Sequence, residues 1–310
     1  MAEVIKHFEN LLQTDQDLSV PVAAIKALSE LIPTSKANTM AEFIQEIEKS
    51  VESLKRHFND AVSVSAGCEL FLRFVTRTAT DFIEFEKCKK RLYERGSKFE
   101  QKASMCRQKI AQSALNFIRD GTNILIHSYS RVVTLVLLKA AAANKRFTVY
   151  VTEARPGCSG ISSAEILRKA GIPVKVILDS AVGYYMESID MVLVGAEGFV
   201  ENGGLINQIG TYLISVMAKA ANKPFYAVAE SFKFVRLFPL SQSELSTGTP
   251  TSLSYRTFSN QMMNDPIIKK EDLASPLLDY TPPAYITLLF TDIGVLTPSG
   301  VSDELIKLYY

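Results

Sequence analysis

Tryptophan is absent from this chain, and cysteine and histidine are scarce: its 310 residues include four cysteines and three histidines. The cysteines lie far apart and form no CxxC pair, so they are interpreted as reduced thiols, not as a disulfide framework or a zinc site. The histidines are equally scattered, so no metal is expected. These residues are Cys68, Cys88, Cys106, Cys158, His7, His57 and His127.

An excess of either charge is also lacking, because 34 lysines and arginines balance 33 aspartates and glutamates. The net charge of +1 gives no strong field to attract nucleic acid or a membrane surface. No apolar run approaches the roughly 20 residues of a membrane helix. The first 17 residues carry early charges and no long apolar core, unlike a secretory signal. We therefore expect a cytosolic protein with no membrane partner and no direct nucleic-acid partner.

What is present is a globular composition, 47% hydrophobic and 22% charged, and enough length for two domains. Residues 1–120 predict an N-terminal helical domain and residues 121–310 an α/β domain. In the first domain, apolar residues recur at helical spacing over Met40–Val62. Pro21 suits a first helical turn, and a long helical pattern covers Asp81–Arg119.

The long pattern has a basic face that leaves two interpretations open, RNA binding or an ordinary solvated helix face. Glutamates interrupt the basic run and no aromatic residues are interleaved for base stacking, which favours the solvated face. The basic residues are Lys87, Lys89, Lys90, Arg91, Arg95, Lys98, Lys102, Arg107 and Lys109.

From Gly121 onward, short runs rich in Val, Ile and Leu alternate with helical segments. This alternation predicts a Rossmann-like, doubly wound parallel sheet with both faces buried. The strand runs are 123–126, 147–151, 174–178, 191–194, 225–229 and 285–290, and the helical segments are 131–143, 163–170 and 211–221. The Ser/Thr/Pro-rich segment 241–283 is predicted to be a long loop.

The stretch Val192–Thr211 is typical of a ligand site. An apolar strand stops at Gly195, a polar loop rich in glycine follows, and Gly210 leads into a helix. The carboxyl ends of parallel strands share one edge of a sheet, so this loop should meet the polar residues after the other strands, among them Arg131. Arginines and helix N-termini suit a phosphorylated small molecule.

Other details of these strand ends limit the prediction. No GxGxxG motif follows the first strand, which disfavours a dinucleotide. Arg155 has a second interpretation, a structural ion pair with Glu153 or Asp179.

Several motifs at these strand ends resemble a known superfamily. The resemblance is to the regulatory subunits of eukaryotic translation initiation factor 2B, foremost those of alpha type, and to the methylthioribose-1-phosphate and ribose-1,5-bisphosphate isomerases. The motifs are VTEARP at 151–156, DSAVGY at 179–184, GAEG at 195–198, NGGLINQIGT at 202–211, GCELFLRFVTR at 67–77, ERG at 94–96, HSYSRVV at 127–133, AESFKFVRLFPL at 229–240 and LLFTDIGVLTPSGVSDELIKLYY at 288–310.

The resemblance implies an N-terminal helical domain, a C-terminal Rossmann-like domain and a role. The role is that of a regulatory, non-catalytic subunit of the guanine nucleotide exchange factor for initiation factor 2, as a homodimer that bridges two halves of the complex. Expected partners are a second copy of the chain, the beta, gamma, delta and epsilon subunits, and the phosphorylated alpha subunit of initiation factor 2. By the same resemblance, Thr39 and Glu42 lie on the surface that faces this phosphorylated partner.

The resemblance also bears on catalysis. The isomerases place a cysteine directly before the motif that corresponds to TEARP, and an aspartate in the motif that corresponds to GAE; Val151 and Glu197 stand at those positions here. Valine has no ionisable or nucleophilic group, and the longer glutamate shifts its carboxylate by roughly an ångström, so the chain is not expected to be an enzyme. The alternative is a sugar-phosphate isomerase with remodelled residues, in which Cys158 substitutes for the missing thiol.

A chain that lacks the catalytic residues can still keep the ligand-binding site. A phosphorylated sugar is the expected ligand, and no other cofactor is expected. Gln208 replaces the lysine that is usual in the family, which removes a cation and leaves a hydrogen-bond donor. The residues predicted to bind the ligand are Tyr129, Ser130, Arg131, Arg155, Glu197, Asn202, Asn207 and Gln208.

Overall fold

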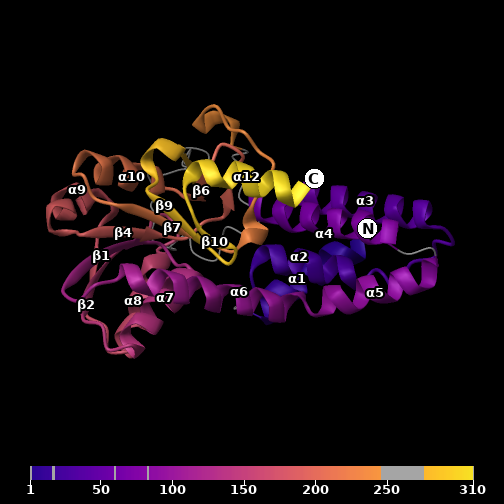
Figure 1. Ribbon diagram of the computed structural model, residues 1–310, viewed down its shortest axis with the longest axis horizontal. Helices are drawn as coiled ribbons and strands as arrows, with labels where there is room; N and C mark the ends of the chain where they lie inside the picture. Colours follow the sequence, from indigo (N-terminus) through magenta and orange to yellow (C-terminus); the bar gives the residue numbers. More distant parts are fainter. Residues whose placement is uncertain (1, 16–17, 59–60, 82–83, 246–275, 310) are drawn as a thin grey trace, which may run out of the picture. The chain divides into compact units, whose positions relative to one another are not determined.

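The computed structural model describes residues 2–15, 18–58, 61–81, 84–245 and 276–309. The chain divides into two compact units, each described here by itself (Figure 1). Unit 1 contains the residues up to Met105 together with Phe232–Val235 and Tyr309–Tyr310, and unit 2 contains Cys106–Ser231 and Arg236–Leu308. The helix α6 contributes residues to both units, and so does α12, whose last residue Tyr309 belongs to unit 1; the domain boundary at residue 120 stays a prediction.

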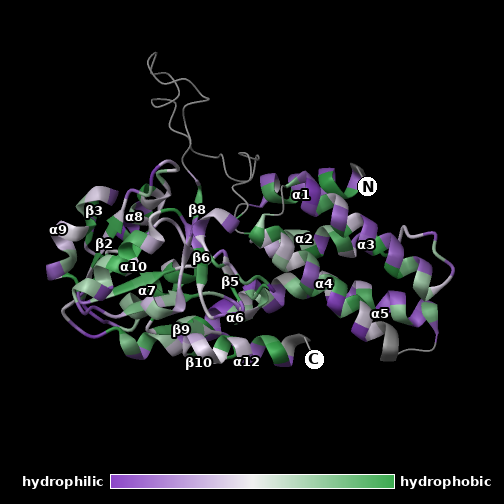
Figure 2. Cartoon of the chain, turned by 90° about the horizontal axis from the view of Figure 1, so that it is seen from above, coloured by the Kyte–Doolittle hydropathy of each residue, from purple (hydrophilic) through white to green (hydrophobic). Residues whose placement is uncertain are grey.

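Unit 1 is helical. Figure 2 shows hydrophilic residues alternating with hydrophobic ones along its helices α1, α3 and α5, as expected for helices that bury one face. The helix α2 packs against α1, α4 and α5 and is buried over most of its length. The helices are α1 (Ala2–Thr14), α2 (Val20–Ser29), α3 (Met40–His57), α4 (Val62–Asp81), α5 (Phe85–Ser97) and α6 (Phe99–Ala114).

Two motifs that carried the resemblance explain how α2 is held. A Cβ at Gly67 of α4 would lie 2.5 Å from the Pro21 carbonyl oxygen of α2. A Cβ at Gly96 of α5 would lie 2.0 Å from the Ser29 hydroxyl of α2. Glycine at both positions therefore lets α4 and α5 approach α2 closely, so GCELFLRFVTR and ERG are packing motifs in this structure.

The predicted helices of unit 1 are correct in kind, and two boundaries are wrong. The pattern Met40–Val62 is divided, because α3 ends at His57 and Val62 begins α4. The pattern Asp81–Arg119 is also divided, at Lys98, between α5 and α6. Apolar spacing continues through a tight turn, so periodicity alone does not show where one helix stops.

Unit 2 contains a seven-stranded sheet, mostly parallel, as predicted. The strand order is β10-β9-β7-β4-β1-β2-β3, and only the pair β9 and β10 is antiparallel among the described strands of this sheet. Figure 1 shows α7 and α8 on one face of this sheet and α9 and α10 on the other. The strands are β1 (Thr122–His127), β2 (Phe147–Thr152), β3 (Val174–Ile177), β4 (Met191–Val194), β7 (Phe225–Val228), β9 (Leu288–Thr291) and β10 (Gly294–Leu296).

The helices of unit 2 follow the predicted alternation. They are α7 (Arg131–Ala142), α8 (Ser159–Lys169), α9 (Val182–Tyr185), α10 (Thr211–Ala220) and α12 (Pro298–Tyr309). Short 3-10 helices occur at η1 (Leu115–Phe117), η2 (Asp179–Ala181), η3 (Met186–Ser188), η4 (Ser231–Lys233), η5 (Gln242–Glu244) and η7 (Pro283–Tyr285).

A second, three-stranded sheet corrects two predicted loops. Its antiparallel strands are β5 (Gly198–Phe199), β6 (Leu205–Gln208) and β8 (Leu278–Thr281), in the order β5-β6-β8. The first two lie inside the stretch Val192–Thr211, and β8 lies inside the predicted loop 241–283, of which residues 246–275 are outside the described residues. These strands are two to four residues long, which is too short for a recognisable alternation of apolar and polar residues. The glycines and prolines beside them indicate a loop instead.

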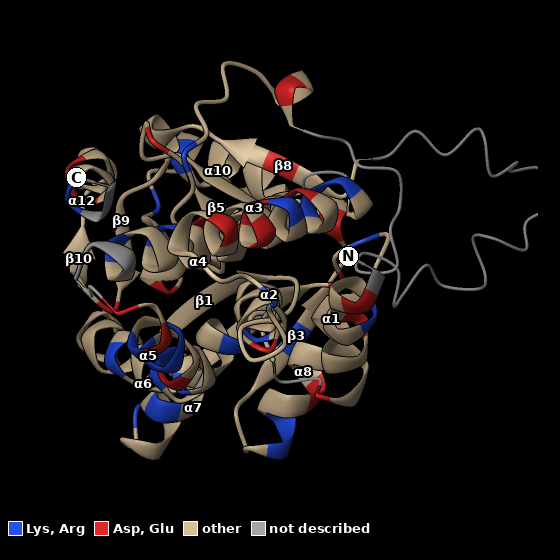
Figure 3. Cartoon of the chain, turned by 90° about the vertical axis from the view of Figure 1, so that its right-hand side faces the viewer, with Lys and Arg blue, Asp and Glu red and all other residues tan. Residues whose placement is uncertain are grey.

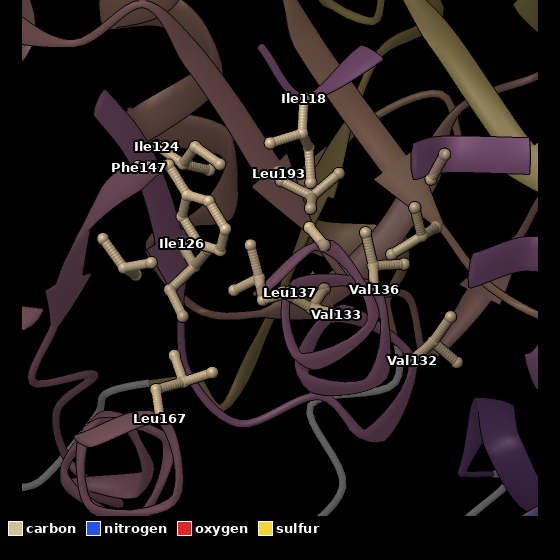
Figure 4. Packing of buried hydrophobic residues seen from close by; sticks show 14 of the residues in the cluster. Ile118, Ile124, Ile126, Val132, Val133, Val136, Leu137, Phe147, Leu167 and Leu193 are labelled. Carbon is tan, nitrogen blue, oxygen red and sulfur yellow. The ribbon is translucent and has the colours of Figure 1, made fainter. Parts of the chain in front are cut away.

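The core of unit 2 lies between the sheet and the helices on its α7 face. Figure 4 shows Val133, Val136 and Leu137 of α7 directed toward strand residues such as Ile126 and Leu193. These side chains are buried, so they fix α7 against the centre of the sheet and hold its N-terminus at the carboxyl end of β1.

Candidate functional site

The candidate site lies where the chain reverses direction across the sheet. From β1 the chain winds outward through β2 and β3, and it then returns to β4 on the other side of β1. In open α/β sheets, ligands bind at such a switch point, outside the carboxyl ends of the two central strands. The end of β1 leads to Ser130 and Arg131, and the end of β4 leads to Gly195 and Glu197.

These two strand ends touch each other. A Cβ at Gly195 would lie 2.5 Å from the Ser130 hydroxyl oxygen, so glycine is needed for this close approach. Ser130 is also the N-cap of α7, and its hydroxyl accepts a hydrogen bond from the Val133 amide at 3.4 Å. The helix N-terminus, where Tyr129, Ser130 and Arg131 are all partly buried, therefore lies beside Gly195, two residues before Glu197.

His127 joins three of the loops at this edge. Its Nε2 lies 2.8 Å from the Ile209 carbonyl oxygen, and its Nδ1 lies 2.6 Å from the Thr152 hydroxyl. Because a carbonyl only accepts, Nε2 carries the proton, and Nδ1 of the neutral ring accepts from Thr152. Burial lowers the pKa of His127, which agrees with a neutral ring. The histidine therefore fixes the ends of β1 and β2 against the start of α10.

Arg155 follows its structural interpretation. Its Nε lies 3.2 Å from a carboxylate oxygen of Glu153. Asp179 does not receive this side chain; its two oxygens accept hydrogen bonds from the backbone amides of Ala154 and Arg155, at 2.9 and 2.7 Å. The Asp179 carboxylate of DSAVGY thus holds the backbone of TEARP, and Arg155, 45% exposed, pairs with its neighbour Glu153.

Val151 and Thr152, adjacent in β2, point to different surroundings. Val151 belongs to the buried hydrophobic cluster between the sheet and the helices. Thr152 contacts His127 in the polar network at the strand end. A residue at position 151 is therefore placed for packing, and Thr152 is the residue of this strand that reaches the polar groups.

The amide side chains predicted to bind a ligand are held by the second sheet. Asn202 closes its own turn, because its Oδ1 accepts from the Gly204 amide at 2.9 Å and its Nδ2 donates to the Tyr280 hydroxyl at 2.6 Å. Asn207 is buried and donates to the Thr211 hydroxyl at 3.0 Å. Thr211 in turn donates to the carbonyl of Gln208. These residues have structural roles that the sequence does not reveal.

Asp279, the carboxylate of this region whose pKa is shifted most, was not predicted from the sequence. It stands opposite Asn207 in the ladder of β6 and β8 and is only 5% exposed. Its Oδ2 accepts hydrogen bonds from the amides of Gly210 and Tyr212, at 2.8 and 2.9 Å, at the start of α10. Burial raises the pKa of Asp279 to about 7, although these two bonds act to lower it. The residue was missed because it falls in the segment predicted as a loop.

A buried ion pair was also missed. Arg107 of α6, 17% exposed, lies with its Nε 3.6 Å from a carboxylate oxygen of Glu230, which is 2% exposed at the end of β7. Assigning Arg107 to the basic face of a solvated helix is therefore wrong. Elsewhere that face carries local pairs, Lys87 with Glu84 and Arg91 with Glu94, as expected of a solvated helix. Figure 3 shows acidic and basic residues mixed along α3 and α5.

Thr39 and Glu42, predicted to meet a partner, form the N-terminal cap of α3. The Thr39 hydroxyl accepts from the Glu42 amide at 3.3 Å, and the Glu42 carboxylate accepts from the Asn38 amide at 3.0 Å. This is close to the capping box of a Thr-x-x-Glu sequence, in which the two side chains satisfy amides at the helix start. Both residues are exposed, so the cap also shapes the surface at the start of α3.

The described residues limit the chemistry in two ways. No helix among them combines the length and apolar character required to cross a bilayer. No group of three or more His, Cys, Asp or Glu side chains in the described part of the chain is arranged to hold a metal ion. The arrangement at the switch point offers hydroxyls, amides, a helix N-terminus and carboxylates, which suit a hydroxyl-rich phosphorylated ligand.

The chain is similar to known proteins over nearly its whole length. The model of the initiation factor 2 subunit family matches residues 13–298. A translation initiation factor eIF2B subunit alpha from Dictyostelium discoideum is 48% identical over 310 residues, 99% of this chain and 96% of the relative. A ribose 1,5-bisphosphate isomerase from Methanocaldococcus jannaschii is 32% identical, over 69% of this chain and 68% of the relative. The tetrameric eIF2B-beta2-delta2 complex of C. thermophilum contains a chain with a TM-score of 0.78 at 18% identity, covering 99% of this chain and 95% of that one.

Proposed function

The chain belongs to the initiation factor 2 subunit family, and from this we propose that it is an alpha-type regulatory subunit of translation initiation factor 2B. The observation that supports the proposal is 48% identity to such a subunit, over 99% of this chain. In this role the chain assembles with the beta, gamma, delta and epsilon subunits, and the complex exchanges guanine nucleotide on initiation factor 2. A reconstituted exchange assay, with and without this chain, tests the role; no change in rate or in regulation contradicts it.

We propose that the subunit is a homodimer that bridges two halves of the complex through unit 2. Tyr184 of α9 is 82% exposed and Leu213 of α10 is 48% exposed, and these two helices are in contact. Exposed large apolar side chains on adjacent helices are typical of an interface. The double variant Tyr184→Asp, Leu213→Asp should be monomeric by light scattering, while Tyr93→Asp on α5 should leave the mass unchanged. A dimeric double variant contradicts this choice of face.

The helical unit is proposed to sense the phosphorylated alpha subunit of initiation factor 2 at the start of α3. The exposed cap formed by Thr39 and Glu42 supports this, because it sets the course of the chain where α3 begins. Glu42 repels phosphate, so its contribution is to position neighbouring groups. The variants Thr39→Ala and Glu42→Gln should blunt inhibition by phosphorylated substrate and preserve basal exchange. An unchanged inhibition curve, with folding verified by circular dichroism, contradicts this role.

A second proposed function is the binding of a phosphorylated sugar at the switch point, without isomerase activity. It is supported by the close approach of Ser130, the N-cap of α7, to Gly195 in the loop that carries Glu197. Arg131, the first residue of α7, supplies the cation. Calorimetry with a panel of sugar phosphates tests binding, and Arg131→Ala should abolish it. Turnover of a sugar phosphate in a direct isomerase assay supports the alternative, a remodelled enzyme.

A further inference from the structure

The carboxylate of Asp279 has one oxygen occupied and one available. Its Oδ2 accepts from the amides of Gly210 and Tyr212, which fixes the orientation of the carboxylate. Within the described residues, its Oδ1 is buried and has no hydrogen-bond partner. A buried carboxylate oxygen without a hydrogen-bond donor is unfavourable in free energy. A bound ligand could supply the donor that the described residues do not.

A second buried atom with the same need lies on the same face of β8. The Thr281 hydroxyl, two residues beyond Asp279 and fully buried, also has no partner within the described residues. Side chains two positions apart on a strand point to one face. Asn207, which is opposite Asp279 in the ladder, belongs to the predicted ligand set. Two unpartnered polar atoms therefore share one side of the β6–β8 ladder with a candidate ligand residue.

Asp279, Thr281 and Asn207 form a cluster, the Asp279 corner, that lies next to the switch point. His127 bonds the carbonyl of Ile209, and a Cβ at Gly210 would lie 3.0 Å from the imidazole of His127. Three residues beyond His127, Ser130 begins the helix that carries Arg131. The end of β1 thus leads to the helix N-terminus that carries Arg131 and is linked, through Gly210, to the Asp279 carboxylate.

The Asp279 corner is electrostatically unfavourable for an anion. The amides at the start of α10, which would otherwise attract a phosphate, are already bonded to Asp279. Gln208 supplies no positive charge here, and above about pH 7 the Asp279 carboxylate adds a negative one. A second phosphate at this corner would meet like charge, whereas a hydroxyl would give Oδ1 the donor it lacks.

We propose that Asp279 is a specificity-determining residue that accepts a hydroxyl of the bound sugar and excludes a second phosphate. This inference rests on the proposed sugar-phosphate binding and narrows its ligand to a monophosphate. Its phosphate lies at the Arg131 side, and its hydroxyl end is enclosed beside Asp279, Thr281 and Asn207. The relative named as a ribose 1,5-bisphosphate isomerase would differ from this chain in the number of phosphates on its sugar.

Calorimetry with ribose 5-phosphate and ribose 1,5-bisphosphate tests the proposal. At pH 8, where the Asp279 carboxyl with its pKa of about 7 is ionised, the unsubstituted chain should bind the monophosphate at least tenfold more tightly. Asp279→Asn removes the charge and keeps an acceptor for the two amides, so the preference should fall by on the order of tenfold. Asp190→Asn is the matched control, because Asp190 also accepts a backbone amide, that of Asn123, but at the amino end of the sheet; its preference should not change.

Thr281→Val supplies a second measurement that does not depend on the folding of the Asp279 variant. It removes the hydroxyl with little change of shape and should weaken ribose 5-phosphate binding by roughly three- to tenfold. Binding of neither sugar by the unsubstituted chain overturns the proposed ligand function and this inference with it. Equal binding of both sugars, full preference in Asp279→Asn or unchanged affinity in Thr281→Val overturns only the role of this corner.

Discussion

Asp279 should also make the stability of unit 2 depend on pH, and Asp279→Asn should remove that dependence. The pKa of this carboxyl is raised from 3.8 to about 7 in the folded chain because the group is buried. Between those two values the folded state holds a proton that the unfolded state has released. The free energy of unfolding therefore falls as pH rises from about 4 to about 7, and it levels off above that range.

The size of this effect follows from the shift. A change of about three pKa units corresponds to about 4 kcal/mol at 1.36 kcal/mol per unit, which is an upper limit for the loss. The asparagine keeps an oxygen for the amides of Gly210 and Tyr212 but leaves a buried NH₂ donor without a partner, at a cost of about 1–3 kcal/mol. The variant should thus match or fall below the unsubstituted chain at pH 5 and gain relative to it at pH 8.

Urea unfolding followed by circular dichroism at several pH values between 5 and 8 measures this difference. The expected result is a free-energy difference between variant and unsubstituted chain that moves by a few kcal/mol in favour of the variant across that range. Parallel pH profiles for the two proteins would mean that Asp279 ionises alike in the folded and unfolded states, which contradicts a raised pKa in the folded chain.

Further substitutions test the packing and the polar network. Gly67→Ala should destabilise unit 1 by about 1–3 kcal/mol in urea unfolding, because the new Cβ would lie 2.5 Å from the Pro21 carbonyl; an unchanged midpoint would contradict the close packing of α4 on α2. Thr152→Val should cost about 1–3 kcal/mol by leaving Nδ1 of His127 without a donor, and the imidazole signals in NMR should shift; a silent substitution would refute the bond. Leu193→Ala should cost about 2–5 kcal/mol by opening a cavity in the core of unit 2, measured by thermal unfolding, and a loss below 1 kcal/mol would contradict its place there.

Much of the α/β fold follows from the sequence because the strands of a parallel sheet are buried on both faces. Runs such as Met191–Val194 are continuous and apolar, and the structure forms a strand over those residues. The helix predicted from Arg131 begins at that residue, where Ser130 caps it. The short strands β5, β6 and β8 were missed since two to four residues show no period that separates them from a turn.

The site was less predictable than the fold. The carboxyl ends of β1 and β4 could be placed together, because parallel strands share an edge, and Gly195 does lie against Ser130. Sequence could not show that Arg155 pairs with Glu153 or that Asn202 closes its own turn, since both contacts depend on local backbone geometry. Asp279 was not predicted because its role depends on its burial and on the strand paired with β8. The residues next to it in the sequence indicate neither.

The central claim is that this chain is a regulatory subunit of an exchange-factor assembly. Affinity purification of the chain from cells that express it natively, with mass spectrometry of the intact co-purifying chains, tests it most directly. The expected result is the beta, gamma, delta and epsilon subunits of initiation factor 2B in the same complex. Recovery of this chain alone, at salt concentrations that preserve such assemblies, would contradict the account and favour a free-standing sugar-phosphate protein.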